Sequence, residues 1–408
     1  MNFTYNRVVV VGGGAAGFFT AIVLADLKKD VEVIILEKTM QPLAKVKISG
    51  GGRCNVTHDC YDPQTLSMNY PRGSDVLRKA FYTFQPKDMI QWLQDRGVEI
   101  KIEHDGRIFP KSNTSSTIIE CFLKQAKDLN VKVQLHSEVQ QLQKLEDGWR
   151  VQTKDQGSID CDYLVLATGG LKKSYELFTQ LGHTLIEPVP SLFTFNIKDE
   201  RLDDLSGVSV SNAKLSIEGA SFSSQGPLLI THWGVSGPGV LRLSAFAARY
   251  LHDSDYDATL CVNWAPQYAE HEVRESLLSL KKENSAKPIA YTPAFGIPKN
   301  LWKKLLEFCH IFEDKLWAHL SKQELHQLVQ VIVKSQFKIQ GKSTNKDEFV
   351  TCGGVSWKEV DHKTMESKVC KGLFFVGEVL DSDGVTGGFN FQNAWTTAWI
   401  AAHAIGDS

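Results

Sequence analysis

The first 37 residues predict a β-strand, a helix and a second β-strand, because short apolar runs flank one longer apolar stretch. Residues 8–11 are four consecutive valines, residues 17–29 have the composition of a buried helix, and residues 31–36 are again mostly apolar. Short β-branched runs between turn residues are typical of buried parallel strands. We therefore expect a βαβ unit at residues 1–37 that opens an α/β domain.

The pattern changes near residue 190 and again near residue 266. Apolar residues then alternate, as at Val208 and Val210, which favours half-buried strands, whereas residues 268–334 follow the period of amphipathic helices. Glycine-rich loops, one short apolar strand and a last helix return towards the C-terminus. We expect a nucleotide-binding domain at 1–190 and 352–408, an inserted β module at 191–265 and 335–351, and a small helical module at 266–334.

Composition narrows the classes of partner. Among the 408 residues, 45 Lys and Arg nearly balance 47 Asp and Glu, so no general field attracts nucleic acid or an anionic membrane. The N-terminus has neither the basic flank nor the apolar stretch of a signal peptide, so we expect a cytoplasmic protein without nucleic-acid or membrane partners. The eight cysteines form no C-x-x-C and no zinc-like spacing, which predicts no metal site.

The segment between the first strand and the first helix carries a phosphate-binding pattern. Gly12, Gly14 and Gly17 fit G-x-G-x-x-G, and Glu37 follows twenty residues after Gly17, at the end of the second strand. Glycine at these places permits the tight turn, the approach of a pyrophosphate to the backbone and close helix packing. The acid is placed to accept hydrogen bonds from a ribose. The sequence therefore predicts a dinucleotide site.

Three further glycine segments indicate which dinucleotide binds. Residues 161–170 end a buried strand in Thr-Gly-Gly, residues 47–58 form a glycine-rich connection, and residues 372–406 join Gly377-Glu378 to a helix expected near Asn390. An acid at a strand end suits a ribityl chain, and a glycine-flanked helix start donates N–H groups to an electron-rich ring edge. A nicotinamide dinucleotide has no ribityl chain, so we expect FAD.

Two residues of the 47–58 connection leave alternatives open. Arg53 is expected to balance diphosphate charge. Cys54 is either a small residue packed beneath the cofactor or a thiol whose pKa the neighbouring Arg53 lowers. Cys54 and His58 are also candidates for covalent attachment of the flavin, against noncovalent binding.

These motifs together resemble the bacterial BaiN/YhiN-type flavoproteins, a group that includes aminoacetone-oxidase-like enzymes. The resemblance rests on GGGAAG, SGGGRCN, LATGG, THWGVSGP and the C-terminal GLFFVGEVLDSDGVTGGFNFQNAW, and it spans nearly the whole chain. It implies one FAD per chain in a Rossmann-like domain, with a β-barrel insert and a small helical domain. The family commonly has Gly-Arg-Lys where this chain has Leu43-Ala44-Lys45, so either Lys45 or Lys47 supplies the anion contact of that arginine or the contact is lost.

The residues expected to bind FAD come from the motifs and the strand ends. They are Gly12, Gly14, Ala15, Ala16, Gly17, Glu37, Lys38, Lys45, Ser49, Gly50, Gly51, Gly52, Arg53, Cys54, Asn55, Val139, Ala167, Thr168, Gly169, Gly377, Glu378, Gly387, Gly388, Phe389, Asn390 and Phe391.

The sequence indicates the cofactor more clearly than it indicates the reaction. No second G-x-G-x-x-G follows, so NAD(P)H either docks transiently against the flavin or the organic substrate reduces it and oxygen reoxidises it. We favour an FAD-dependent oxidoreductase that acts on a small organic substrate with NAD(P)H. The alternatives are an oxygen-dependent amine oxidase of the aminoacetone-oxidase type and a flavin-binding regulator without turnover. An NAD-only dehydrogenase leaves 372–406 without a role, and the near-neutral charge argues against a tRNA-modifying enzyme.

One histidine is the preferred catalytic candidate. His232 precedes a helix expected to start near Pro238, and its ordinary pKa near neutrality suits a proton donor or acceptor. A structural histidine bonded to the backbone is the alternative interpretation, and His58 is the second candidate.

Overall fold

The computed structural model describes residues 5–170, 172–343 and 350–408, and it divides the chain into two compact units. The first unit comprises residues 1–190 and 346–408, and the second comprises residues 191–345. The sequence pattern placed the corresponding breaks at 190/191 and 351/352.

A five-stranded parallel sheet forms the centre of the first unit, in the order β20-β10-β1-β2-β6. Its strands are β1 (Arg7–Val11), β2 (Glu32–Leu36), β6 (Lys132–Gln134), β10 (Tyr163–Leu166) and β20 (Leu373–Phe375). The four valines of β1 are almost fully buried, as expected for a parallel strand covered on both faces. The first βαβ unit predicted from the sequence is therefore confirmed.

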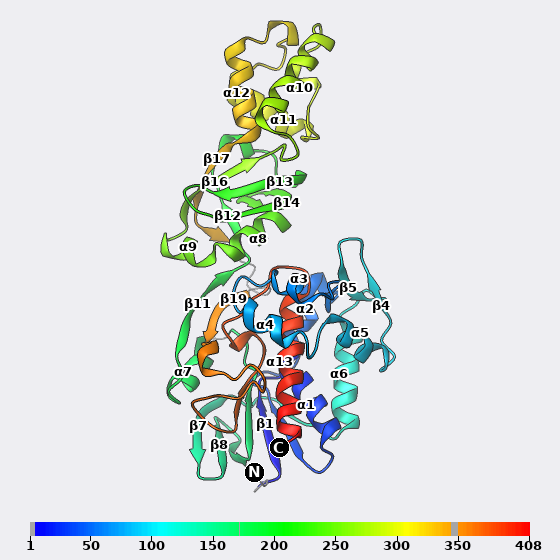
Figure 1. Ribbon diagram of the computed structural model, residues 1–408, viewed down its shortest axis with the longest axis vertical. Coiled ribbons are helices and arrows are strands. Elements are labelled where there is room, and N and C mark those ends of the chain that lie inside the picture. Colours follow the sequence, from blue (N-terminus) through cyan, green and yellow to red (C-terminus); the bar gives the residue numbers. More distant parts are fainter. Residues whose placement is uncertain (1–4, 171, 344–349) are drawn as a thin grey trace. The chain divides into compact units, whose positions relative to one another are not determined.

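Two helices from opposite ends of the chain lie side by side in this unit. The helices α1 (Ala15–Leu27) and α13 (Phe389–Gly406) run together beside the sheet, α1 in blue and α13 in red (Figure 1). Both are apolar around most of their surface, because each packs on the sheet and on its neighbour. The remaining helices of the unit are α2 (Ala44–Gly52), α3 (Pro63–Ser67), α4 (Ser74–Ala80), α5 (Pro86–Gln94), α6 (Ser116–Asp128) and α7 (Lys172–Thr179).

Three small sheets complete the first unit. A hairpin at Gly148 is extended by a third strand, giving β7 (Val139–Leu145), β8 (Gly148–Thr153) and β9 (Gly157–Cys161). A second sheet joins β3 (Thr57–His58), β5 (Arg107–Pro110) and β4 (Ile100–Ile102), and β11 (Leu185–Ser191) pairs with β19 (Val350–Val355).

Over its described residues, the second unit combines one sheet with five α-helices. The sheet has the order β17-β16-β13-β14-β15-β12-β18, with β12 (Thr194–Asn196), β13 (Ser209–Ile217), β14 (Ser223–Thr231), β15 (Gly234–Ser236), β16 (Asp257–Asn263), β17 (Ser335–Gln340) and β18 (Lys342–Ser343). The helices are α8 (Pro238–Phe246), α9 (Ala248–Asp253), α10 (Glu270–Glu283), α11 (Lys299–Phe308) and α12 (Lys322–Val333).

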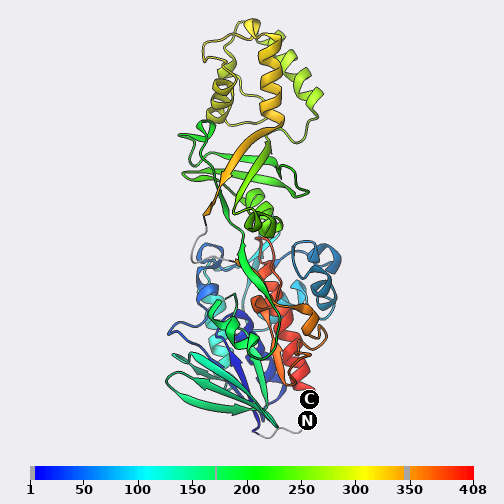
Figure 2. The same ribbon diagram turned by 90° about the vertical axis from the view of Figure 1, so that its left-hand side faces the viewer.

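Helices α10, α11 and α12 gather at one end of the second unit, and both views show them there (Figure 2). Their buried side chains belong to one hydrophobic cluster with those of the sheet, for example Leu301 and Leu328 with Leu215 and Phe337. A closed barrel and a separate helical domain remain predictions. Over the described residues, no helix combines the length and apolarity needed to cross a membrane.

Candidate functional site

The predicted cofactor residues follow the carboxyl ends of four neighbouring parallel strands. Gly12 follows β1, Glu37 follows β2, Ala167 to Gly169 follow β10, and Gly377 and Glu378 follow β20 in the short η5 turn (Gly377–Val379). Ligands of open α/β sheets bind at this edge. The fold thus gathers segments separated by more than 300 residues of chain at one edge of the sheet.

The glycine turn after β1 leaves no room for larger residues. Gly12 has φ of +112°, and a Cβ atom built there would lie 2.4 Å from the carbonyl oxygen of Ala167. A Cβ on Gly17 would lie 2.0 Å from the carbonyl oxygen of Gly12. Gly14 differs, because a Cβ there meets nothing within 4 Å. Gly12 and Gly17 therefore permit the close packing, and Gly14 faces open space.

The N-terminus of α1 is suited to an anion. Gly14 is its N-cap, no side chain caps it, and no acidic residue lies in its first turn. The first N–H groups of a helix have no partner within it, and its dipole favours negative charge there. Ala15 and Ala16, which were predicted to contact the cofactor, are the first two residues of this helix.

The carboxylate of Glu37 is held by hydrogen bonds to the glycine turn after β1 and to Thr39. Its Oε2 accepts a hydrogen bond from the Gly13 N–H over 2.9 Å, and its Oε1 accepts from the N–H and hydroxyl of Thr39, each over 2.8 Å. These bonds fix the carboxylate beside the glycine turn. Lys38 is exposed, and Val139 begins β7 two residues after Ser137, whose N–H donates to the Glu37 carbonyl.

Glu378 connects three parts of the site. Its Oε2 lies 2.6 Å from Lys45 Nζ, and its Oε1 accepts the Thr351 N–H over 3.2 Å. A Cβ atom on Gly169 would lie 3.4 Å from Oε2. Lys45, offered as the replacement for the missing family arginine, is thus positioned at this edge through Glu378.

A buried hydroxyl at the end of β10 lacks a partner. Thr168 Oγ1 is inaccessible to solvent and makes no hydrogen bond with any described residue. A buried polar atom without a partner is costly and suggests an unseen ligand or water. Together with the open space at Gly14 and the uncapped α1, this hydroxyl fits the expectation that a dinucleotide occupies the edge.

The glycine-rich connection expected at residues 47–58 is helical at its start, which the sequence did not predict. Residues 44–48 begin helix α2, the helical geometry breaks at Ser49, and Gly50 and Gly51 adopt positive φ of 58° and 68°. Ser49 Oγ donates to the Val46 carbonyl over 2.8 Å. The glycines lower helix propensity only after Ile48, so the preceding turn remains helical. Gly51 and Gly52 have no atom within 4 Å of a built Cβ.

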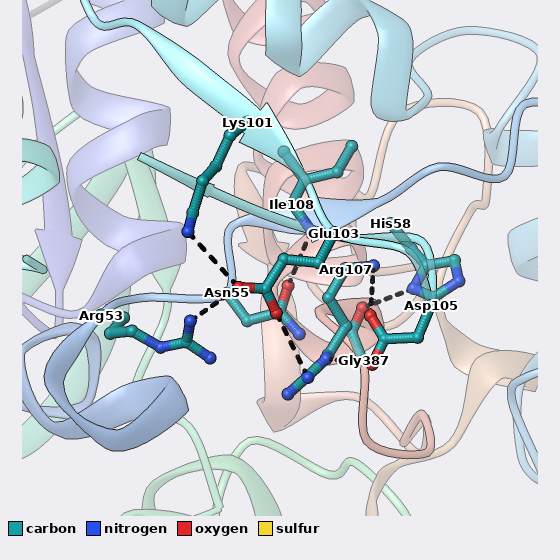
Figure 3. A network of polar contacts seen from close by, with 9 residues as sticks. All are labelled: Arg53, Asn55, His58, Lys101, Glu103, Asp105, Arg107, Ile108 and Gly387. Carbon is teal, nitrogen blue, oxygen red and sulfur yellow. Dashed lines mark hydrogen bonds and ion pairs between the residues drawn. The ribbon is translucent and has the colours of Figure 1, made fainter. Parts of the chain in front are cut away.

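Arg53 has a protein partner that the sequence did not predict. Its Nη1 lies 2.7 Å from Glu103 Oε1, and its guanidinium stacks 4.0 Å from the centre of the Phe109 ring. Figure 3 shows Glu103 also facing Lys101 and Arg107. Arg53 lowers the pKa of Glu103 through its hydrogen bond, which keeps this acid ionised. Arg53 therefore shares one carboxylate, that of Glu103, with two other cations.

Cys54 is a buried small residue, and the alternative of an activated thiol was wrong. The side chain is 0% exposed, and burial raises the pKa of the thiol to about 12. Desolvation is the largest cause, and a hydrogen bond with Ser49, which lowers the pKa, offsets it only in part. The next residue, Asn55, accepts the Ile108 N–H with Oδ1 over 3.3 Å and so ties the loop to β5 (Figure 3).

The start of α13 meets the end of this loop. Gly387 and Gly388 have φ of 125° and 91°, and a Cβ on Gly388 would lie 2.6 Å from the Thr57 carbonyl oxygen. His58 Nδ1 lies 3.0 Å from the Gly387 carbonyl oxygen (Figure 3), and its ring stacks on Phe389 at 4.6 Å. The helix was expected near Asn390 and starts at Phe389.

The last two predicted residues of this segment are already engaged in protein contacts. Asn390 Oδ1 accepts the Gly384 N–H and its Nδ2 donates to the Gly384 carbonyl, each over 2.8 Å. Phe391 stacks on Trp395 with ring centres 5.5 Å apart. Both residues therefore shape the glycine turn from within the chain.

The preferred catalytic histidine belongs to the second unit. His232 lies in the turn between β14 and β15 with its side chain exposed, next to Trp233, which is 70% exposed. Helix α8 begins two residues after Ser236, with Gly237 as its N-cap, as the sequence indicated.

Sequence reasoning missed several residues that support the site. Thr351 holds Glu378, Glu103 holds Arg53, and Arg72 pairs with the buried Asp383 in the loop before α13. None lies in a glycine motif. Asp383 offered one signal. An acid in a C-terminal segment that was expected to be buried needs a cationic partner from elsewhere in the chain.

Comparisons with known proteins agree with this geometry. The model of the HI0933-like protein Rossmann domain family matches residues 6–404. The chain belongs to this family. Its resemblance to the BaiN/YhiN-type proteins is thereby confirmed.

Two relatives and one solved structure show the range of similar proteins. The chain is 31% identical to a ribosomal RNA dihydrouridine synthase of Haemophilus influenzae, covering 98% of each chain. It is 28% identical to a 3-dehydro-bile acid delta(4,6)-reductase of Clostridium scindens, covering 98% of this chain and 99% of that one. The fold resembles a 3-ketosteroid-delta4-(5alpha)-dehydrogenase from Rhodococcus jostii RHA1, with a TM-score of 0.51, 14% identity and 98% coverage of both chains. These findings support a Rossmann-type, FAD-binding oxidoreductase family.

Proposed function

We propose that this protein binds FAD along the carboxyl edge of the central sheet and uses it to reduce a carbon–carbon double bond next to a carbonyl group. The observation that carries the proposal is the convergence of the glycine turns after β1, β10 and β20 with the glycine-flanked start of α13. NAD(P)H is the proposed hydride source. It would dock transiently, because the sequence has no second G-x-G-x-x-G.

Each part of the cofactor has a proposed set of residues. Gly12, Gly14 and Gly17 with the start of α1 would hold the diphosphate, and Glu37 would accept hydrogen bonds from the adenosine ribose. Glu378 suits the ribityl chain, and the N–H groups after Gly387 suit the electron-rich edge of the flavin ring. Bound FAD supplies a two-electron carrier that the protein side chains lack.

The names of the two relatives indicate which kind of double bond would be reduced. One forms dihydrouridine in ribosomal RNA, and the other reduces the delta(4,6) bonds of a 3-dehydro bile acid. Dihydrouridine differs from uridine by two hydrogens added across the ring double bond next to a carbonyl, and a 3-dehydro bile acid carries its double bonds in conjugation with a ketone. Hydride addition to the far carbon of such a bond, followed by a proton, is common to both reactions.

We infer that a uracil base of ribosomal RNA is the first substrate to test. The relative that acts on ribosomal RNA matches this chain at 31% identity over almost all of both chains. The expectation of a small-molecule substrate without nucleic acid rested on the near balance of charge, and it remains the competing prediction. His232 is the proposed proton donor.

One anaerobic assay distinguishes these functions. FAD-loaded protein is mixed with NADH or NADPH and with one of three substrates: an unmodified ribosomal RNA transcript, a steroid with a double bond conjugated to a 3-ketone, or aminoacetone. Products are identified by mass spectrometry. We expect dihydrouridine in the RNA at the expense of NAD(P)H.

Reduction of the steroid alone would support the small-molecule alternative, and flavin reduction by aminoacetone without NAD(P)H would support the amine oxidase. Flavin binding without turnover on any donor would contradict the proposal and leave a regulator.

A further inference from the structure

The loop between β20 and α13 is fixed by a buried ion pair that the proposed site does not use directly. Asp383 is 0% exposed, and Arg72 Nε donates to Asp383 Oδ1 over 2.6 Å while Arg72 Nη2 donates to Oδ2. The two residues also pair as an isolated antiparallel bridge. A two-point contact between a guanidinium and a carboxylate fixes orientation as well as distance.

A tyrosine from the same segment holds the first residue of α13. The Tyr70 hydroxyl donates to the Phe389 carbonyl over 2.6 Å, and the two rings meet edge to face at 6.1 Å. The Phe389 ring also stacks on His58. Burial raises the pKa of Tyr70 well above its usual value, so the hydroxyl keeps the proton that it donates.

Further contacts connect the two segments along their length. The Val385 N–H donates to the Asn69 carbonyl over 2.9 Å, and a Cβ on Gly73 would lie 2.8 Å from Ser382 Cβ. A Cβ on Gly384 would lie 3.2 Å from the Tyr70 ring. The segment 69–73 thus lies directly against the loop 381–388 that leads into the glycine turn.

We propose that Tyr70, Arg72 and Asp383 form a clamp that sets the direction of the N–H groups at the start of α13 and thereby tunes flavin affinity and reduction potential. The proposal rests on the proposed binding of FAD. The three are positioning residues, because they act through the main chain of Gly387, Gly388 and Phe389. A helix N-terminus stabilises the negative charge of a reduced flavin more than the neutral oxidised ring. A clamp that loosens should therefore lower the reduction potential as well as weaken binding.

A merely structural brace would leave the reduction potential of the bound flavin unchanged. Measuring this potential therefore distinguishes a clamp that tunes the flavin from a brace that only stabilises the fold. Tyr70→Phe removes one hydroxyl, and Arg72→Lys keeps the charge but loses the two-point contact. Two controls remove matched interactions elsewhere. Arg150→Lys weakens the two-point pair with Asp160 between β8 and β9, and Tyr291→Phe removes the hydroxyl that donates to Glu313 in the second unit.

The experiment has two measurements. Hydrogen exchange of the apoprotein reports on the amides of residues 384–390 without any cofactor, and FAD titration with redox potentiometry reports on the bound flavin. For Tyr70→Phe and Arg72→Lys we expect faster exchange in 384–390, a dissociation constant raised about tenfold and a lowered potential, whereas both controls match the wild type. If Arg72→Lys fails to fold, the results for Tyr70→Phe alone test the clamp.

Three outcomes have distinct meanings. Wild-type exchange, affinity and potential in folded clamp variants would overturn the clamp. Faster exchange with an unchanged potential would also overturn it, since the pair would then be only a structural brace. Failure of the wild-type protein to bind FAD would instead refute the proposed function, while hydrogen exchange would still show whether the clamp orders the loop.

Discussion

Lys45 Nζ lies 2.6 Å from Glu378 Oε2, which joins the beginning of α2 to the turn after β20 across 333 positions of the sequence. Lys45 is 57% exposed and Glu378 is 20% exposed, so the acid is the better shielded partner. The pair brings a cation to the sheet edge in a chain that lacks the arginine common at this position in its family. It also holds Glu378 close to Gly169 at the end of β10.

The first prediction concerns this pair. Glu378→Gln keeps an acceptor for the Thr351 N–H but loses the negative charge, so the apoprotein should remain as stable as the wild type. FAD affinity should fall about tenfold, because hydrogen bonds to a charged acceptor are the stronger ones. Fluorescence titration with FAD measures the effect. Glu99→Gln, which breaks the exposed pair between Glu99 and Lys111, is the matched control and should bind normally. Equal affinity in Glu378→Gln would remove this acid from the site.

Gly12 and Gly14 should respond differently to the same substitution. Gly12→Ala places a Cβ 2.4 Å from the Ala167 carbonyl oxygen at φ of +112°, so unfolding of the apoprotein in urea should show a loss of at least about 2 kcal/mol. Gly14→Ala adds a methyl group to open space and should leave stability within about 0.5 kcal/mol. The same Gly14 variant should bind FAD more weakly, since the methyl group enters the diphosphate space. A stable Gly12→Ala protein, or normal FAD binding by Gly14→Ala, would contradict this account.

Cys54 should make stability depend on pH in the alkaline range. Its folded pKa of about 12 lies above the ordinary thiol value of 9, so the folded state keeps a proton that the unfolded state has released. The stabilisation is complete below about pH 9 and declines towards pH 12, by about 1.4 kcal/mol per pH unit. The measurement is the difference in unfolding free energy between wild type and Cys54→Ala across this range. A difference that does not change with pH would show that the thiol is not desolvated.

His232 is the proposed proton donor, and its substitution should separate binding from turnover. His232→Gln should bind FAD with wild-type affinity and reduce substrate at least about tenfold more slowly, since a positioned general acid typically contributes about a hundredfold or more. His326→Gln, an exposed histidine on α12, is the control. Steady-state kinetics under anaerobic conditions give the rate of substrate reduction for each of the two variants. Turnover of His232→Gln at the wild-type rate would exclude this histidine from the mechanism.

The local parts of the site could be predicted from the sequence because their physical requirements are local. Gly12 and Gly17 need the absence of a side chain, and the acid at Glu37 follows a β-strand at the usual interval. The parallel arrangement of the strands then brings the other glycine turns to the same edge. The cap of α12 was equally readable, since Ser321 and Glu324 form the reciprocal hydrogen bonds of a capping box.

The electrostatic partners could not be predicted, because they come from distant segments. Arg53 stands next to three glycines, which suggested an anion ligand, and its partner Glu103 lies 50 positions away. Cys54 has a cation as its chain neighbour and yet lies in an apolar interior. The pairing of Arg72 with Asp383 spans 311 positions. Adjacency in sequence therefore indicated the wrong environment for Cys54 and did not reveal the acidic partner of Arg53.

The most direct test of the central claim is a comparison of FAD and FMN binding to the purified protein, measured by isothermal titration calorimetry. FMN lacks the adenosine half that the turn at Gly12 to Gly17 and Glu37 are proposed to hold. We predict that one FAD binds per chain and that FMN binds at least about a hundredfold more weakly, because it forgoes those contacts. Equal affinity for the two flavins, or no binding of FAD, would contradict the assignment of this sheet edge.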